Sequence, residues 1–468
     1  MVGDLASSWD SSDGKVWTFR IRRDVKWHDG KEVTARDVAF TYKYLREKFP
    51  VYVRHFNLME DVQAVDKETV TVRLLGPNSR FPVNVSGIGI LPKHIFENVA
   101  DPGSYFEHGA SLGCGPFIFQ SLDRRNGILT FVANPDHAPR KPTVDSVRIR
   151  TFKNADTLYL ALKKGEIDLP FNFPMGNDVP LLHSLKGASR ISLAAISNLG
   201  VPRALFFNTG KPPANNPAFR RALSMAIDYQ AMLDLFSGGY GRWPKSGFVP
   251  DGSPGFIETD PLVHSPREAA SILDGLGFAD VDGDGLREYD GKPWALDCVV
   301  SNDSVENVRV AECLKGDFRK VGLDFAPRYV DMNVFQSIVN REKTYTLLLH
   351  RTTPWGMLSW AGCGSAYIDD RNMGWTRTND AALQRIIDRM NASMNERAYL
   401  LAAADLQRYY SSNLCAVPLY WNSLALPYNN RLSGWKVDAI NGLIGPESWF
   451  SLTETVPADK SSGLHSGN

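Results

Sequence analysis

Apolar and polar residues alternate at 16–23 and 69–74, and a third stretch, 128–132, is rich in residues that favour strands. A period of two places the apolar side chains on one face of an extended segment, so 16–23 is predicted to be a half-buried strand, and the other two stretches are predicted to be strands as well. Residues that favour turns follow each stretch, as the G-P-N run at 76–78 does, because glycine and proline interrupt regular structure. A fourth strand is predicted over 294–300.

Other stretches have a helical period. The clearest is a set of four apolar residues spaced three or four apart, which gathers them on one face of a helix. The set consists of Leu383, Ile386, Ile387 and Met390. A second helix is predicted to follow over 396–410.

Residues typical of helix ends support further helices. Asn216 before Pro217 is a helix start, with a capping side chain and then proline at the first helical position. Ser265 with Glu268 adds the pattern of a capping box. Gly165 is expected to end the helix before it, because glycine adopts the left-handed conformation of a C-terminal cap.

Strands and helices thus mix along the whole chain, which is typical of α/β and α+β proteins. A chain of 468 residues exceeds the size at which a single core stops growing, so we expect two or three lobes. Hydrophobic residues make up 43% and charged residues 22%, as in globular proteins generally. Lys plus Arg equals Asp plus Glu at 52 each, so no net charge favours nucleic acid, and none is expected as a partner.

The five cysteines are widely spread and contain no C-x-x-C pair, so no structural zinc site is expected. Free buried cysteines are favoured over one disulfide bridge. No run approaches the roughly 20 apolar residues of a membrane span, and residues 1–5 lack a signal-peptide pattern. The polar tail at 457–468 is predicted to be disordered.

Several sequence blocks occur in a recognisable order. Residues 5–9 read L-A-S-S-W, 13–22 read D-G-K-V-W-T-F-R-I-R, 25–30 read V-K-W-H-D-G and 33–38 read V-T-A-R-D-V. They are followed by G-C-G-P-F at 113–117, N-P-D at 134–136, G-E-I-D at 165–168 and F-R-R-A-L-S-M-A-I-D at 219–228. This order resembles family 5 of the solute-binding proteins of ABC importers, whose best-known members bind oligopeptides, dipeptides and nickel chelates.

The resemblance implies an α/β fold of two lobes joined by a hinge, the type II (cluster C) periplasmic-binding-protein fold, with an extra lobe. The predicted boundaries are 1–113 for the extra lobe, 114–213 with a return at 431–456 for the first main lobe, and 214–430 for the second. The ligand would lie between the two main lobes, which close by hinge motion.

The resemblance also implies a function. It predicts the non-catalytic substrate-binding component of an ABC importer, periplasmic or extracellular, that delivers a peptide, opine or metal chelate to a permease and its ATPase subunits. We expect a monomer without a cofactor. A sensor on the same fold is the alternative. A hydrolase is less favoured, because the sequence has no G-x-S-x-G, P-loop or H-E-x-x-H motif.

The first departure from the family pattern concerns the N-terminus. Family members carry a segment ahead of the L-A-x-x-W block that includes a strand of the first lobe and part of the ligand cleft. That segment is absent here, which would leave a neighbouring strand with unpaired backbone groups. We expect a truncated gene product, a mis-set start codon or a divergent member.

The second departure concerns the ligand. Oligopeptide-binding relatives use an aspartate to hold the peptide's amino terminus, but residues 350–360 read H-R-T-T-P-W-G-M-L-S-W and the next carboxylate is Asp369. Peptide binding through that anchor is therefore not expected. The H-R-T…W-G run is more similar to the nickel-chelate branch, yet residues 81–88 replace that branch's arginine-rich segment. Neither branch fits cleanly.

The same stretch holds the candidate ligand residues. Arg351 can bind a carboxylate, and Trp355, Trp360 and Tyr367 can hold apolar or planar groups. The alternative is that the tryptophans belong to the core and Arg351 to a structural ion pair. The resemblance places the stretch at the cleft and so favours ligand binding.

The run D-V-D-G-D-G at 280–285 matches the start of a calcium-binding loop. Asp280, Asp282 and Asp284 are its candidate ligands, but the twelfth position is Gly291 where such loops have glutamate. Short Asp/Gly loops also form tight turns ahead of a strand. The turn is favoured, and the calcium loop is the second interpretation.

Overall fold

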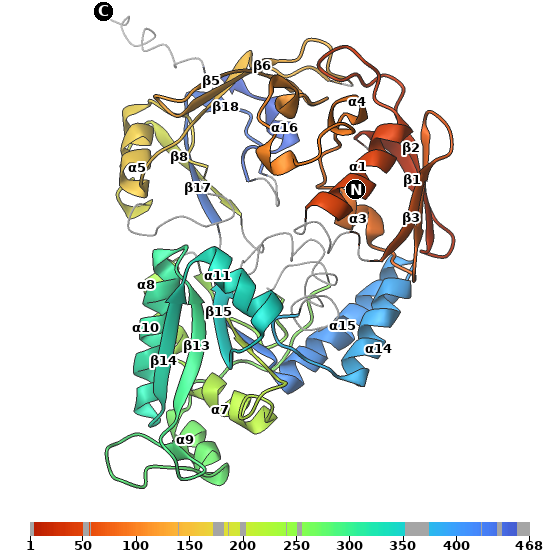
Figure 1. Cartoon of the computed structure of the whole chain (residues 1–468). Helices are drawn as coiled ribbons and strands as arrows, with labels where there is room; N and C mark the ends of the chain where they lie inside the picture. Colours follow the sequence, from red (N-terminus) through yellow and green to blue (C-terminus); the bar gives the residue numbers. More distant parts are fainter. Residues whose placement is uncertain are drawn as a thin grey trace, which may run out of the picture. The chain divides into compact units, whose positions relative to one another are not determined.

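The computed structural model describes residues 4–49, 56, 58–138, 140–171, 182–185, 187–196, 203–239, 241–249, 255–351, 374–422, 424–437 and 442–455. The chain divides into two compact units (Figure 1). Unit 1 comprises Met1–Ile21, Val38–Gly89 and Ser197–Leu424, and unit 2 comprises Arg22–Asp37, Ile90–Ile196 and Ala425–Asn468. The three-lobe division stays a prediction.

The largest element of unit 1 is a six-stranded sheet with the strand order β10–β16–β9–β15–β13–β14. The bounds are Arg203–Phe207 for β9, Gly241–Arg242 for β10, Ala295–Ser301 for β13, Asp324–Val330 for β14, Leu347–Arg351 for β15 and Ala416–Asn422 for β16. Strands β13, β14 and β15 are parallel, whereas β9 is antiparallel to β15 and to β16. The ends of β13–β16 and the start of β9 therefore share one edge, the carboxyl edge.

Both faces of this sheet are buried. Leu205 and Phe207 of β9 face a core that includes residues of α7 (Pro217–Ala226), α8 (Tyr229–Phe236), α9 (Pro266–Gly275) and α10 (Val305–Lys320). Ala204 and Phe206 belong to the opposite core, with Phe335 of α11 (Met332–Ser337). Strands buried on both faces carry unbroken apolar runs, and β9 and β15 have such runs.

A second sheet in unit 1 lies near the N-terminus, with the order β1–β2–β4–β3 and antiparallel pairing throughout. Its strands are Ala6–Asp10, Val16–Ile21, Met59–Ala64 and Thr69–Leu74, for β1 to β4, and the adjoining helices are α1 (Ala35–Lys48) and α3 (Phe81–Val85). The segment after β4 joins a helical pair, α14 (Ala381–Ala392) and α15 (Glu396–Asn413). The Ser79 amide donates to the Asn391 carbonyl at 2.8 Å, and the Arg80 guanidinium lies 5.0 Å from the ring centre of Tyr399.

Unit 2 contains a three-stranded antiparallel sheet, β5–β6–β7, formed by Phe117–Asp123, Ile128–Ala133 and Ser146–Arg150. Two strand pairs and three helices accompany it. They are β8 (Ile191–Ile196) with β17 (Leu424–Asn429), β18 (Leu432–Ser433) with β19 (Thr453–Glu454), and α4 (Lys93–Phe96), α5 (Ala155–Lys164) and α16 (Pro446–Trp449).

One face of the β5–β6–β7 sheet is apolar and incompletely covered. The register aligns Leu122 with Leu129 and Ile149 in one row, and Phe119 with Phe131 and Val147 in the next. We call these six residues the apolar face. All six are partly or fully exposed, and Leu122 and Ile149 are 43% and 50% exposed.

The predicted strands and helix caps can be compared with the structure. The four predicted strands correspond to β2, β4, β6 and β13. Gly165 ends α5 with φ = 74°, and the side chain of Asn216 accepts a hydrogen bond from the Ala218 amide at 2.9 Å, as predicted. The capping box at Ser265 is wrong: α9 begins at Pro266, but the Ser265 side chain makes no capping hydrogen bond.

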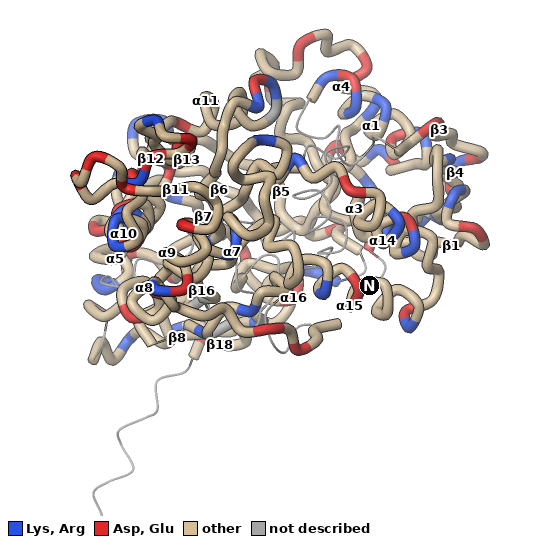
Figure 2. The backbone as a smooth tube through the Cα atoms, turned by 90° about the horizontal axis from the view of Figure 1, so that it is seen from below, with Lys and Arg blue, Asp and Glu red and all other residues tan. Residues whose placement is uncertain are grey.

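Positive and negative residues are interspersed along the backbone (Figure 2), in keeping with the balanced composition. None of the described helices is both long enough and apolar enough to cross a membrane. The structure describes four cysteines, and none of them forms a disulfide bridge: Cys114, Cys298, Cys313 and Cys415.

Candidate functional site

The carboxyl edge of the six-stranded sheet is the candidate functional site. In open α/β sheets, ligands bind outside the carboxyl ends of the strands, where loops and helix N-termini meet. Here β13 ends at Ser301 and α10 begins at Val305, with the Ser304 hydroxyl accepting a hydrogen bond from the Glu306 amide at 3.3 Å. The first turn of α10 therefore lies next to the ends of the strands.

A buried polar cluster ties this turn to β9 and β16. We call it the Arg203 cluster, and it consists of Arg203, Ser304, Glu306, Asn307 and Tyr420. Arg203, at the first position of β9, is 3% exposed, and its Nη2 donates to Glu306 Oε2 at 2.8 Å and to Ser304 Oγ at 3.3 Å. Its Nη1 donates to Asn307 Oδ1, and the Tyr420 hydroxyl donates to Glu306 Oε1.

The electrostatics of the cluster favour its charged form. Burial alone would lower the pKa of Arg203, but the attraction of Glu306 and Tyr420 and the hydrogen bonds to both together outweigh burial and raise that pKa. Burial raises the pKa of Tyr420 well above its usual value, and the neighbouring Glu306 carboxylate raises it further. A charged guanidinium is thus held by a carboxylate and by a phenol that keeps its proton.

The predicted ligand residue Arg351 is the last residue of β15 and so lies at the carboxyl edge. The backbone register places it opposite Arg203. The other three predicted ligand residues, Trp355, Trp360 and Tyr367, lie outside the described residues. The role of all four stays a prediction.

The sequence analysis did not find the Arg203 cluster. Glu306 lies 103 positions from Arg203, and Tyr420 lies another 114 positions beyond Glu306, so only the fold brings the three residues together. One signal was available: a lone arginine at the head of the apolar run R-A-L-F-F, where a charge can be buried only with a partner.

Beneath the edge, on the face opposite α10, lies an aromatic cluster. The His350 ring is 4.9 Å from that of Phe335 and 5.3 Å from that of Trp375, and Trp375 makes an edge contact with Phe206 at 5.1 Å. His350 is 7% exposed and Phe335 is fully buried. This packing supports the end of β15 from below.

The Asp/Gly run forms a tight exposed loop. One ligand atom from each of Asp280, Asp282 and Asp284 lies within 4.8 Å of the others. Each carboxylate accepts a hydrogen bond from a loop amide, such as Gly283 N to Asp280 Oδ1 at 2.7 Å and Leu286 N to Asp284 Oδ1 at 2.7 Å. This is the bonding of a turn, and the calcium interpretation stays a prediction.

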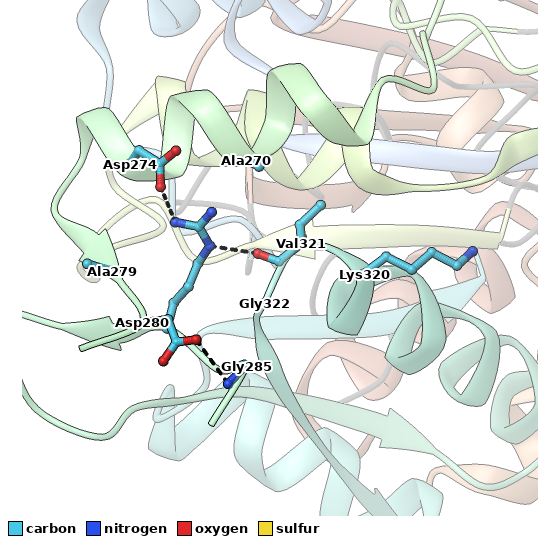
Figure 3. A pocket seen from close by; sticks show the side chains of 9 residues that line it. Ala270, Asp274, Ala279, Asp280, Gly285, Lys320, Val321 and Gly322 are labelled. Atoms are coloured by element: carbon cyan, nitrogen blue, oxygen red, sulfur yellow. Dashed lines mark hydrogen bonds and ion pairs between the residues drawn. The ribbon is translucent and has the colours of Figure 1, made fainter. Parts of the chain in front are cut away.

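A surface hollow of about 460 Å³ borders this loop (Figure 3). Arg287 crosses its wall, paired with the Asp274 carboxylate and donating through Nε to the Val321 carbonyl at 2.8 Å. Val321 and Gly322 come just before β14. The hollow therefore lies at the amino ends of the parallel strands, opposite the carboxyl edge.

Comparison with solved structures identifies the class of fold. A periplasmic oligopeptide-binding protein from Thermotoga maritima matches with a TM-score of 0.82 at 20% identity, covering 96% of this chain and 90% of that one. NikZ from Campylobacter jejuni, in complex with Ni(L-His), matches with a TM-score of 0.79 at 23% identity and the same coverage. The predicted α/β periplasmic-binding-protein fold is confirmed.

The sequence identifies the family. Residues 1–372 match the model of bacterial extracellular solute-binding proteins, family 5, so the chain belongs to this family, as predicted. A probable D,D-dipeptide-binding periplasmic protein of Escherichia coli is 31% identical over 261 residues, which are 55% of this chain and 49% of that protein. The nickel-binding periplasmic protein of E. coli is 25% identical over 75% of this chain and 67% of its own length. The chain spans about half to two thirds of the length of the curated relatives it matches.

Proposed function

We propose that this chain is the substrate-binding component of an ABC importer, which captures a small solute and delivers it to a permease with its ATPase subunits. The observation that carries the proposal is the match of residues 1–372 to a family of solute-binding proteins. The proposal includes a non-catalytic role, a periplasmic or extracellular location and the three-lobe division at 1–113, 114–213 with 431–456, and 214–430.

The proposed solute is peptide-like or a small metal chelate. The relatives point to this class, because they are named for binding D,D-dipeptides, oligopeptides and nickel. Both kinds of solute carry carboxylates, which arginine binds in a bidentate manner. We propose that Arg351 is the carboxylate anchor and that Trp355, Trp360 and Tyr367 contact the rest of the solute.

A thermal-shift screen tests the proposal. The probes are D-alanyl-D-alanine, a nonapeptide, and nickel with L-histidine. A ligand present at about 100 times its dissociation constant adds about 2.7 kcal/mol to the free energy of unfolding, which raises the melting temperature measurably. If the folded protein shows a cooperative transition that no probe of either class moves, the proposed solute class is wrong.

The anchor is tested by Arg351→Ala, with Arg328→Ala as the matched control. Arg328 is an exposed arginine on β14, the edge strand of the same sheet. We expect Arg351→Ala to weaken binding of the probe that scores in the screen by about tenfold or more, and Arg328→Ala to leave it unchanged. Equal affinity of the two variants would refute the role of Arg351.

A further inference from the structure

The Arg203 cluster joins β9, α10 and β16 at the point where β15 ends. We propose that this cluster is a positioning device: it fixes the carboxyl end of β15, and with it Arg351, for binding the carboxylate of the solute. This inference rests on the proposed function and deepens it, because it names residues that act on the site without touching the ligand.

The first argument is the register. In an antiparallel pair, the position of one strand's backbone is set by the residue opposite it. Arg351 stands opposite Arg203, and Arg203 is the first residue of β9. Whatever holds the start of β9 therefore also holds the last residue of β15.

The second argument is the number and burial of the bonds at Arg203. Its guanidinium bonds to three side chains of one helical turn, those of Ser304, Glu306 and Asn307. Asn307 is itself fully buried and donates to the Ser301 carbonyl at 2.8 Å, at the end of β13. Hydrogen bonds shielded from water are stronger and better oriented than surface bonds, so the start of β9 is held firmly.

The third argument is charge. A charge that is buried without a counter-charge is unfavourable. The Glu306 carboxylate, 2.8 Å from Arg203 Nη2, balances the charge of Arg203. The Arg203 cluster therefore brings no net charge to the end of β15, and its effect on binding is one of position.

The test uses Tyr420→Phe, which removes one hydroxyl from the cluster and keeps the ring that stacks on Phe236 at 5.7 Å. The matched control is Tyr329→Phe. Tyr329 also donates its hydroxyl to a glutamate, Glu312 Oε1 at 2.5 Å, but it lies on the edge strand β14 of the same sheet. Each variant loses one tyrosine–glutamate hydrogen bond.

The first readout is hydrogen exchange of the ligand-free protein. We expect the amides of Leu349–Arg351 to exchange about tenfold faster in Tyr420→Phe than in the wild type, with β13 and β14 unchanged. Tyr329→Phe should leave Leu349–Arg351 at the wild-type rate. Faster exchange over the whole sheet in Tyr420→Phe would mean that the cluster only stabilises the fold, and would overturn the inference. An unchanged exchange rate at Leu349–Arg351 would overturn it as well.

The second readout is affinity for the probe that binds the wild type in the screen. We expect about tenfold weaker binding by Tyr420→Phe and unchanged binding by Tyr329→Phe. Local loosening with unchanged affinity overturns the link to binding. If Tyr420→Phe does not fold, Ser304→Ala, which removes one 3.3 Å contact of Arg203, replaces it in both readouts. A wild type that binds none of the probes counts against the proposed function, and the exchange pattern then decides the positioning role alone.

Discussion

The six-stranded sheet of unit 1 and the three-stranded sheet of unit 2 both carry apolar side chains on strands of five to seven residues, apart from the two-residue β10 of the first. In unit 1 all five residues of β9 are buried, whereas in unit 2 no residue of β5, β6 or β7 is. The difference lies in what packs against each sheet. Helices and loops cover both faces of the first, but the apolar face of the second keeps Leu122 and Ile149 about half exposed. Apolar content alone therefore does not set the stability of a strand.

The largest expected difference in the free energy of unfolding follows from replacing one leucine by alanine in each sheet. Leu348 of β15 is fully buried in the core with Phe206 and Phe335, so Leu348→Ala should lower the free energy of unfolding by about 3 kcal/mol through lost burial and a cavity. Leu129→Ala on the apolar face should cost about 1 kcal/mol or less, because solvent already reaches the site. Denaturant unfolding measures both, and equal losses would contradict the comparison.

The next largest difference in the free energy of unfolding is expected between a buried arginine in unit 1 and an exposed arginine in unit 2. Arg220 of α7 is 3% exposed and donates to the carbonyls of Asn413, at 2.7 and 2.9 Å, and of Ala214, at 2.8 Å. Arg220→Ala removes the donors of two buried carbonyls and should cost about 2 kcal/mol. In unit 2, Arg431 makes a bidentate pair with Asp168, but its side chain is 59% exposed, so Arg431→Ala should cost about 0.5 kcal/mol. A larger loss for Arg431→Ala in thermal unfolding would reverse the ranking.

A third change tests the apolar face directly. Ile149→Thr should alter the free energy of unfolding by less than about 0.5 kcal/mol, because the side chain is half exposed. It should also reduce self-association, measured by light scattering at rising protein concentration, because a contiguous apolar patch is interrupted. A loss above about 1 kcal/mol would mean that another part of the molecule covers Ile149 in solution.

The smallest effect concerns pH. The hydrogen bond from the Tyr409 hydroxyl, at 2.7 Å, lowers the pKa of Asp380, which also caps α14. A lowered folded-state pKa means that the carboxylate contributes stability above its unfolded pKa of about 3.9 and loses it as the pH falls through the folded value. Asp380→Asn should therefore be less stable than the wild type by a few tenths of a kcal/mol at pH 7, since asparagine also caps helices. Melting temperatures should converge below about pH 4, and a gap that stays constant from pH 7 to pH 3 would contradict the assignment.

Polarity alternates along β2 and β4, and both strands were predicted from that pattern. β6 and β13 were also predicted, but β9 and β15 were not. β9 and β15 read R-A-L-F-F and L-L-L-H-R, and such short apolar runs do not distinguish a buried strand from a buried helix. Two strands of the candidate site, β9 and β15, were therefore missed, whereas β13 was predicted.

The candidate site was predicted only in part. The resemblance pointed to the stretch that begins at Arg351, and the structure places that residue at the carboxyl edge. Arg203, Glu306 and Tyr420 carry no local pattern that marks them, because their contact depends on three elements meeting. Ser265 shows the opposite error, a local pattern without the expected contact. The sequence predicted a capping box there, but with the backbone at φ = −147° and ψ = 78° the Ser265 side chain makes no capping hydrogen bond.

The place of β9 between β15 and β16 also bears on the order in which the protein folds. Residues 203–207 must wait for residues 347–351 on one side and 416–422 on the other before the sheet is continuous. Closing such long loops is slow, because their entropy is lost before the distant contacts form. The central strand therefore has no partner until residue 351 has been synthesised and lacks its second partner until residue 422 has been, and until then its apolar run is available to other partners.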